Sequence, residues 1–289
     1  MPSVLLATCA ALPRGDEDAP LLVAALAARG VDARWVAWTD RHVDWDAGLV
    51  VLRSTWDYSA DRGRFLRWVD GLPRVANDPA VLRWNTDKVY LRDLAAAGVP
   101  TVPTHFAGPG EPAAFPDRGG FVVKPSVGAG SRGVGRFTSA RAAAARRHAT
   151  ELHSAGRTVL VQPYLADVDT AGETALMYFA GRFSHAVRKG PMLRPDTAHP
   201  VHGAALYIEE NITPRVPDPA ELAVADAALA VVRARFGADP LYARVDLLPS
   251  PAGPVVVELE LSEPSLFLQH GAGEQDPAAA FAAAIAARA

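Results

Sequence analysis

Short apolar runs alternate with helical patterns in the first part of the chain. Ser3 to Ala10 is a β-rich run, and leucines and alanines recur at helical spacing over residues 18–29. Val31 to Val36 and residues 49–52 are two more apolar runs of strand length. Strands that alternate with a helix at this spacing predict a small parallel α/β domain, which we assign to residues 1–98.

Two helices and a linker are expected after these strands. Asp78 and Pro79 suit the cap and the first turn of a short helix. A longer helix is predicted from Thr86 to Ala97, because Gly98 is a natural helix stop. Residues 99–116 are rich in proline and glycine, which indicates a linker to the next part of the chain.

The remaining pattern predicts two further lobes, over residues 99–166 and 167–289. In the first lobe an apolar strand runs into a glycine-rich loop, and in the second a hairpin turns around Ala180 and Gly181. The expected elements are strands at 121–125 and 158–162, a helix at 139–155, a hairpin over 173–189, irregular chain at 190–217, a helix at 219–236, strands at 241–248 and 255–261, and a terminal helix from 277.

Composition and charge narrow the function classes. Of the 289 residues, 49% are hydrophobic and 21% are charged, which is typical of a folded globular protein. The net charge is −3 without a basic block, so nucleic acid is not expected as a partner. The apolar runs are shorter than the roughly 20 residues that span a membrane, so no membrane association is expected. The single cysteine, Cys9, fits a cytoplasmic protein, while a monomer and a homodimer are both left open.

A glycine-rich loop follows the strand that ends at Lys124. Glycines let backbone N–H groups approach a phosphate closely, and a lysine supplies a point charge. The loop also contains a literal G-x-G-x-x-G from Gly128 to Gly133, the pattern of a Rossmann dinucleotide turn, and Glu151 is near the distance of a ribose-binding acid. The loop therefore has three interpretations: a phosphate loop, a nicotinamide-binding turn and a surface hairpin.

Carboxylates gather near the end of the chain. Alternate residues on a strand share a face, so Glu258 and Glu260 point together. If the last two predicted strands pair about the proline-rich turn between them, Asp246 lies opposite Glu258 and Arg244 opposite Glu260. Uncompensated carboxylates on one face repel one another unless a divalent cation binds them, and such hard oxygen ligands suit Mg²⁺. The alternative is an exposed acidic edge that discourages aggregation.

A third feature is the apolar strand that stops at Gln162 and Pro163. A strand that ends in this way is expected at a hinge between two lobes. The backbone of such a hinge can pair with the edge of an adenine, and the amide of Gln162 can add a hydrogen bond. The segment therefore predicts an adenine site.

In chain order, these features resemble the ATP-grasp superfamily over roughly residues 85–265. The resemblance rests on Lys88 after a small α/β domain, Lys124 before the glycine-rich loop, the hinge, Arg188 on a hairpin, and the terminal acids. Glu260 departs from the family, whose metal strand usually ends in a Glu-x-Asn pair, and it adds charge to the expected metal site.

Three runs are similar to a narrower branch of that family, which includes the O-ureido-serine cyclo-ligase of cycloserine biosynthesis. They cover residues 52–58, 84–88 and 258–267. The resemblance implies an α/β fold in which two lobes clamp ATP after the N-terminal domain. It also implies a ligase that uses ATP and Mg²⁺ to activate a small, amino-acid-like carboxylic acid as an acyl phosphate. An amine-type nitrogen, in the same molecule or in another, would then attack.

The resemblance also implies a role for individual residues. A separate set of residues would bind each part of the reacting complex: the ATP phosphates, the adenine, the ribose, the metal and the transferred phosphoryl group. These sets are Lys88 and Lys124 with loop residues Ser126, Gly128, Gly130, Ser131 and Gly133 for the phosphates; Gln162, Tyr164 and Leu165 for adenine; Asp169 or Glu173 for ribose; Asp246, Glu258 and Glu260 for one or two Mg²⁺; and Arg188 with Lys189 for the phosphoryl charge.

The substrate end is expected in the first domain. An open α/β sheet places ligands beyond the carboxyl ends of its strands, where Arg53, Trp56, Asp57 and Tyr58 follow an apolar run. Arg53 could pair with a carboxylate in a bidentate manner, and Asp57 could hold an amino group. The alternative is a capped loop with a buried tryptophan. We assign His202 to the substrate side as well, in a stretch expected to form a lid.

Two other functions compete with the ligase. One is a nicotinamide-dependent oxidoreductase that uses the G-x-G-x-x-G loop. The other is a nucleotide-binding sensor that keeps the fold without turnover. The full set of lysines and acids favours the ligase.

Overall fold

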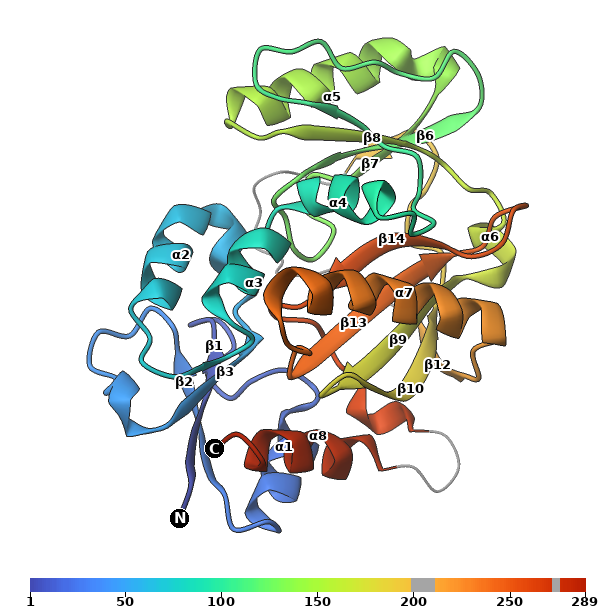
Figure 1. Ribbon diagram of the computed structural model, residues 1–289. Coiled ribbons are helices and arrows are strands. Elements are labelled where there is room, and N and C mark those ends of the chain that lie inside the picture. The colour runs from blue at the N-terminus through green and yellow to red at the C-terminus, as the bar shows by residue number, and fades with distance from the viewer. Residues whose placement is uncertain (199–210, 272–275) are drawn as a thin grey trace.

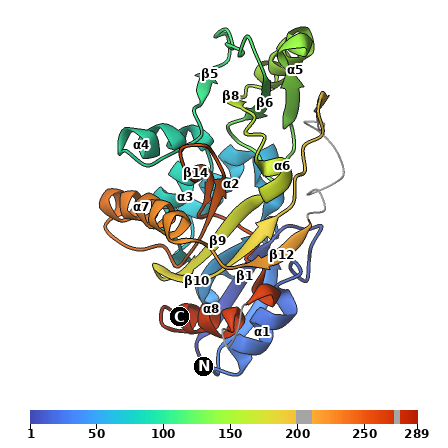
Figure 2. The ribbon, with the colours of Figure 1, turned by 90° about the vertical axis from the view of Figure 1, so that its right-hand side faces the viewer.

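The computed structural model describes residues 1–198, 211–271 and 276–289, which include three sheets. Figure 1 shows a sheet from the N-terminal residues at the lower left, a sheet from the C-terminal half at the centre, and a third sheet at the top. In the side view of Figure 2, the third sheet stands above the central one, and the chain passes between them through a short helix labelled α6.

The N-terminal sheet is parallel, with strands in the order β2-β1-β3-β4. The expected α/β domain is therefore confirmed. The residues from Val4 to Ala7 are fully buried, which explains their continuous apolar pattern, because a parallel sheet is covered on both faces. The elements are β1 (Ser3–Thr8), α1 (Ala19–Ala27), β2 (Asp32–Ala37), β3 (Leu49–Ser54), α2 (Arg62–Asp70), β4 (Val75–Ala76), α3 (Pro79–Asn85) and α4 (Leu91–Ala96).

The helix predicted from Thr86 to Ala97 is in fact two pieces. A 3₁₀ turn, η3 (Lys88–Tyr90), precedes α4, and the side chain of Asp87 accepts a hydrogen bond from the Val89 N–H at its start. Before this turn, Asn85 accepts from the backbone N–H of Leu261 at 2.7 Å. The break follows from these side-chain bonds, which compete with a continuous helix.

The upper sheet is antiparallel, in the order β11-β7-β6-β8-β5. Helix α5 covers it through an apolar cluster that contains Phe121, Phe137 and Leu152. The expected linker at 99–116 includes a short edge strand, which was missed because only three residues pair with β8. The elements are β5 (His105–Ala107), β6 (Gly120–Pro125), β7 (Gly135–Thr138), α5 (Ala142–Ser154), β8 (Val159–Pro163) and β11 (Thr197–Ala198).

The central sheet has the order β12-β10-β9-β13-β14. The hairpin predicted around Ala180 is confirmed, as is helix α7, whose bounds agree with the predicted range. The stretch at 190–217, expected to be irregular, contributes β11 to the upper sheet and β12 to this one. The elements are α6 (Val168–Ala171), β9 (Glu173–Phe179), β10 (Arg182–Lys189), β12 (Ile212–Arg215), α7 (Pro219–Phe236), β13 (Tyr242–Leu248) and β14 (Val255–Glu260).

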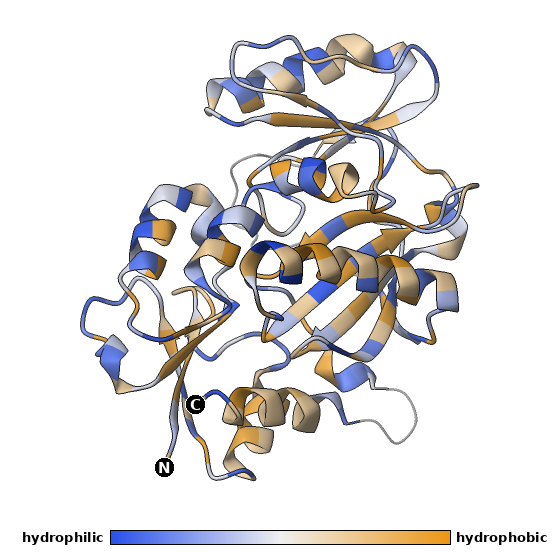
Figure 3. Cartoon of the chain, in the orientation of Figure 1, coloured by the Kyte–Doolittle hydropathy of each residue, from blue (hydrophilic) through white to orange (hydrophobic). Residues whose placement is uncertain are grey.

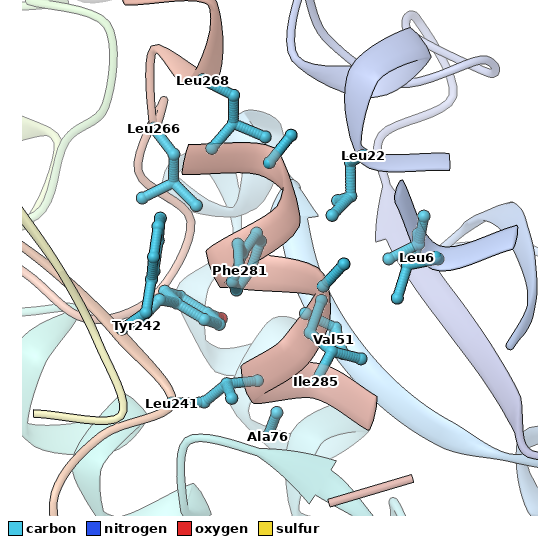
Figure 4. Packing of buried hydrophobic residues seen from close by; sticks show 14 of the residues in the cluster. Leu6, Leu22, Val51, Ala76, Leu241, Tyr242, Leu266, Leu268, Phe281 and Ile285 are labelled. Atoms are coloured by element: carbon cyan, nitrogen blue, oxygen red, sulfur yellow. The ribbon is translucent and has the colours of Figure 1, made fainter. Parts of the chain in front are cut away.

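The C-terminal helix α8 (Pro277–Ala286) joins the first and last parts of the chain. Figure 4 shows its Phe281 and Ile285 among Leu22 of α1, Leu241 and Tyr242, the first residue of β13. Figure 3 shows apolar residues both on the strands of the central sheet and on the helices that pack against the sheets. The division of the chain into three parts at residues 98 and 166 stays a proposal. Strand β11 belongs to the third part but pairs with β7 of the second, and α8 of the third part packs against the first.

Candidate active site

A cavity of about 910 Å³ lies where the three sheets meet, at the upper end of the range for small-molecule sites. One wall comes from the upper sheet and its glycine-rich loop, and the opposite wall from β13 and β14. The loop after β1 and the residue Trp56 close a third side.

All three lysines of the chain line this cavity. They are Lys88, Lys124 and Lys189, and every other basic side chain in the sequence is arginine or histidine. A lysine is a compact point charge suited to phosphate oxygens. Because lysine is so scarce in this sequence, the positions of its three lysines are by themselves a signal for the site.

The pairing of β13 with β14 has the predicted register. Asp246 lies opposite Glu258, and Arg244 opposite Glu260. However, the expectation that these carboxylates are uncompensated is wrong. Asp246 accepts from the Lys189 ammonium at 2.8 Å and from Arg244 Nε at 2.9 Å, and Glu260 pairs with Arg244. Arginine and lysine from the same sheet therefore balance the acids.

The acids differ in how they face the cavity. Glu258 and Glu260 line it, whereas Asp246 is buried beneath them. Burial raises the pKa of Asp246, but Arg244 and Lys189 outweigh it and hold that pKa well below its usual range. Burial, opposed by Arg244 and assisted by Glu258, raises the pKa of Glu260 to about 7.

Among the described residues, no group of three or more acidic, histidine or cysteine side chains is arranged to hold a metal. Two adjacent carboxylates at the wall still fit Mg²⁺, which usually takes one or two protein carboxylates and completes its shell with water and phosphate oxygens. The assignment of Asp246, Glu258 and Glu260 to the metal stays a prediction.

The glycine-rich loop joins β6 to β7, which are antiparallel neighbours. A Rossmann turn connects a strand to a helix within a parallel βαβ unit, so the nicotinamide interpretation is wrong. Gly128, Gly130 and Ser131 line the cavity. Lys88 Nζ donates to the Gly128 carbonyl at 2.9 Å and pairs with Glu258 at 3.0 Å, which ties the loop to β14.

Two predicted loop residues lie away from the cavity. Ser126 is buried, and its backbone bonds to Lys88 and Thr158. The carbonyl of Gly133 contacts the ring of His148 on α5 at 2.8 Å. Both hold the ends of the loop in place, so the expectation that they contact phosphate is corrected.

The predicted adenine segment lines the end of the cavity opposite the N-terminal loop. Gln162, Tyr164 and Leu165 belong to this wall, and Gln162 Nε2 donates to the Thr104 hydroxyl at 2.8 Å. Glu173 is at the wall and pairs with Lys189. Of the two candidates for ribose, Asp169 is instead outside the lining.

Asp169 is held by two neighbours. It accepts from the Tyr164 hydroxyl and pairs with Arg136, whose guanidinium lies 3.4 Å from the Tyr164 ring centre. Its carboxylate therefore orients an aromatic residue of the wall.

Arg188 and Lys189 point in opposite directions, because alternate residues of a strand face opposite sides. Lys189 lines the cavity, whereas Arg188 donates to the carbonyls of Thr170 and Ala171 at the end of α6. Of the two residues, only Lys189 lies where it could reach a phosphoryl group, and its role stays a prediction.

This difference predicts unequal effects of two adjacent substitutions. We expect Lys189→Met to lower kcat by about a hundredfold, the scale of losing one preorganised charge. We expect Arg188→Met to stay within about threefold, as for a side chain outside the cavity. Breaking a buried ion pair costs about 3–5 kcal/mol, so kcat is normalised to the folded fraction from circular dichroism. Equal losses in both variants would contradict the assignment.

The substrate residues predicted after β3 are largely buried supports. Arg53 is fully buried against the rings of Tyr242 and Phe281, because α8 covers the end of the sheet that the sequence left open. Asp57 accepts from the Trp38 indole at 2.7 Å. Neither lines the cavity, so their proposed contacts with substrate are corrected.

The two aromatic residues of the segment after β3 lie in different places, one at the cavity and one in the core. Trp56 lines the cavity and donates its indole N–H to the Glu263 carbonyl at 2.9 Å. Tyr58 is buried in the core and is corrected to a packing residue. His202 lies outside the described residues.

Several cavity residues were not predicted. Asp16 and Asp18 come from the loop after β1, Glu263 follows β14, and Arg132 of the glycine-rich loop donates to the Trp56 carbonyl at 2.6 Å. The rule that ligands lie beyond the carboxyl ends of parallel strands applies to β1 as much as to β3. The acidic run Asp16-Glu17-Asp18 after the first strand was the available signal.

Comparison with known proteins agrees with this geometry. A family model for the N-terminal domain of D-cycloserine synthetase DcsG matches residues 4–77. The cycloserine biosynthesis protein DcsG of Streptomyces lavendulae is 40% identical over 289 residues, 94% of each chain. The crystal structure of D-cycloserine synthetase DcsG is 37% identical, covers 99% of both chains and has a TM-score of 0.89.

The chain belongs to the DcsG family of ATP-grasp ligases. It is thus an ATP-dependent enzyme that forms a C–N bond, and the predicted ATP-grasp architecture is confirmed. More distant structures share the fold alone. They are a RimK domain ATP-grasp protein of Sphaerobacter thermophilus (20% identity, TM-score 0.65, 98% and 99% of the two chains) and the ATP complex of D-alanine–D-alanine ligase from Bacillus anthracis (14%, 0.64, 100% and 97%).

The D-alanine–D-alanine ligase structure holds ATP, and a structure of the ATP-grasp ligase PsnB, which shares the fold, holds Mg and ADP. Among the described residues, helices that combine the length and the apolar character of a membrane span are absent.

Proposed function

We propose that this ATP-grasp ligase closes a ring by activating the carboxyl group of O-ureido-D-serine and joining it to a nitrogen of the same molecule, giving D-cycloserine. The observation that supports this most strongly is the 40% identity with DcsG over 94% of both chains. We further propose that the enzyme works in the cytoplasm.

The proposed reaction balances in three steps. A carboxylate oxygen forms a bond to the γ-phosphorus of ATP while the bond from that phosphorus to the ADP oxygen breaks, which gives an acyl phosphate and ADP. The nitrogen bonded to the side-chain oxygen then attacks the carbonyl carbon, and inorganic phosphate leaves with the C–O bond electrons. The proton of that nitrogen passes to solvent, and water removes the carbamoyl group as ammonia and carbon dioxide. When bound, ATP supplies the phosphoryl group, and Mg²⁺ offsets its charge.

The residues of the cavity divide this work. Lys88 and Lys124 would hold phosphate oxygens from the two sides of the glycine-rich loop, which can close over them. Glu258 and Glu260 would hold Mg²⁺, and Lys189, fixed by Asp246, would face the carboxyl group as its charge changes. Such fixed charges in a site that excludes water stabilise the transferred group without reorganising.

The test is direct. Purified protein is given ATP, Mg²⁺ and O-ureido-D-serine, and ADP and D-cycloserine are measured by coupled assay and mass spectrometry. We expect the two products to form at equal rates. A second reaction contains D-alanine in place of O-ureido-D-serine. ADP release with D-alanine, together with no cyclised product from O-ureido-D-serine, would overturn the ring-closing proposal. Binding of ATP without sustained ADP release would show that O-ureido-D-serine is not the acid that this ligase activates.

A further inference from the structure

Asp16 is an unusual carboxylate at the end of the cavity away from the adenine segment. It lies in the loop after β1 and lines the cavity, and its side chain is 4% exposed. No described residue meets full hydrogen-bond geometry at either carboxylate oxygen, although the backbone N–H groups of Asp16 and Asp18 lie near enough to lower its pKa. Its one described ion pair is with Arg53 Nη2 at 3.6 Å, longer than a hydrogen bond.

Asp18, two residues further along the same loop, has hydrogen-bond partners for its carboxylate. Its two oxygens accept from the backbone N–H groups of Leu266 and Leu268 at 2.8 and 2.7 Å. It also pairs with Arg53 at 3.4 Å. Asp18 therefore fastens the chain after β14 to the first domain, whereas Asp16 is buried at the cavity wall with its two carboxylate oxygens left without a geometric hydrogen bond.

A buried carboxylate without hydrogen bonds is costly, so a protein that keeps one is expected to use it. Burial raises the pKa of Asp16 to about 6, with Arg53 opposing the rise and Asp18 adding to it. The missing partner is a group with N–H donors and a positive charge. The lysines that line the cavity repel such a group, whereas the acidic residues of the loop after β1 attract it.

We propose that Asp16 binds the positively charged amino group of an amino-acid substrate and that Arg53 positions its carboxylate. This inference rests on the proposed function, and it reverses the sequence prediction for Arg53. The arginine does not meet a substrate carboxylate; it lies behind an acid that meets a substrate amine. Trp56, at the same end of the cavity, offers an apolar surface to the body of the substrate.

The test compares two probes in two proteins. The probes are O-ureido-D-serine and its analogue without the amino group, 3-(ureidooxy)propanoate. Asp16→Asn should raise KM for O-ureido-D-serine by about ten- to hundredfold, with KM for ATP unchanged. The analogue should bind the wild type as weakly as O-ureido-D-serine binds the variant, and Asp16→Asn should not weaken the analogue further.

Arg53→Lys keeps the charge but loses the planar fork. We expect it to raise KM for O-ureido-D-serine selectively. The effect should vanish in the Asp16→Asn background, since coupled residues are not additive. The Tm of Asp16→Asn should fall only slightly, because the buried Arg53 keeps its ion pair with Asp18.

Three results would overturn the inference. They are an equal loss for both probes, an unchanged KM, or a loss of Tm that accounts for the weaker binding. Binding of the two probes to the wild type and to Asp16→Asn is also compared by calorimetry with ADP and Mg²⁺ present. This measurement does not require catalytic turnover. Selective binding without product would therefore refute the proposed function and leave the amine site standing.

Discussion

Glu258→Gln should lower kcat by about a hundredfold to a thousandfold at saturating Mg²⁺. Glu258 is one of the two carboxylates of β14 that line the cavity, and glutamine removes the charge that a divalent cation requires while keeping the size. The measurement is steady-state ADP release, normalised to the folded fraction. Near-normal ADP production would exclude Glu258 from the metal site.

A matched control is available on α5. Glu151→Gln makes the same chemical change in a side chain that is 69% exposed. We expect its kcat to equal that of the wild type. Glu151 is also the acid that a nicotinamide-binding turn would have used, so a selective loss in this variant would contradict the phosphate-loop assignment.

The stability of Glu258→Gln follows from its ion pair. Burial raises the pKa of Glu258, but Lys88 and Lys124 outweigh it, so the pKa lies below its usual value. The ionised carboxylate therefore stabilises the fold above the ordinary pKa of glutamate and loses this effect as the pH falls through the lowered pKa. The variant should melt at a lower temperature than the wild type at pH 7, and the gap should narrow in acid. A gain in Tm at pH 7 would show that repulsion among the acids dominates instead.

The register of the last two strands was predictable, because it depends on local rules. Side chains alternate along a strand, and a short turn fixes which residues face each other, so Asp246 and Glu258 could be paired from the sequence. The bounds of α7 were predictable for the same reason. Asp218 and Glu221 form a capping box at its start, and Gly237 adopts a left-handed conformation at its end.

Contacts between distant segments were not predictable. Arg53 was expected at an open sheet edge, but α8, more than 220 residues later, covers that edge with Phe281. The neutralisation of Asp246 by Lys189 likewise depends on β9 lying between β10 and β13. A sequence pattern states which face a residue occupies, but the partner across a sheet is set by topology.

Lys124→Met should weaken ATP binding by about ten- to hundredfold, the scale of one or two hydrogen bonds to a charged group. Lys124 is 7% exposed at the end of β6 and faces the cavity. Burial lowers its pKa to about 8, with Lys88 adding to the fall and Glu258 opposing it. Calorimetric titration of ATP with Mg²⁺ measures the effect, and an unchanged Kd would contradict the placement.

The lowered pKa makes this prediction sharper. At pH 8 about half of the Lys124 side chains in the free protein are neutral, since the pKa lies near 8. Phosphate oxygens favour the charged form, so binding of ATP should take up a proton, and affinity should fall as the pH rises above 8. Calorimetry in buffers with different ionisation enthalpies measures the uptake, and Lys124→Met should abolish it. Because the chain has only three lysines, ¹³C-methylation of its amines gives resolvable signals for these three and the N-terminus, and a pH titration reads the Lys124 pKa directly. If the uptake persists in the variant, another group receives the proton, and Lys124 does not face the phosphates.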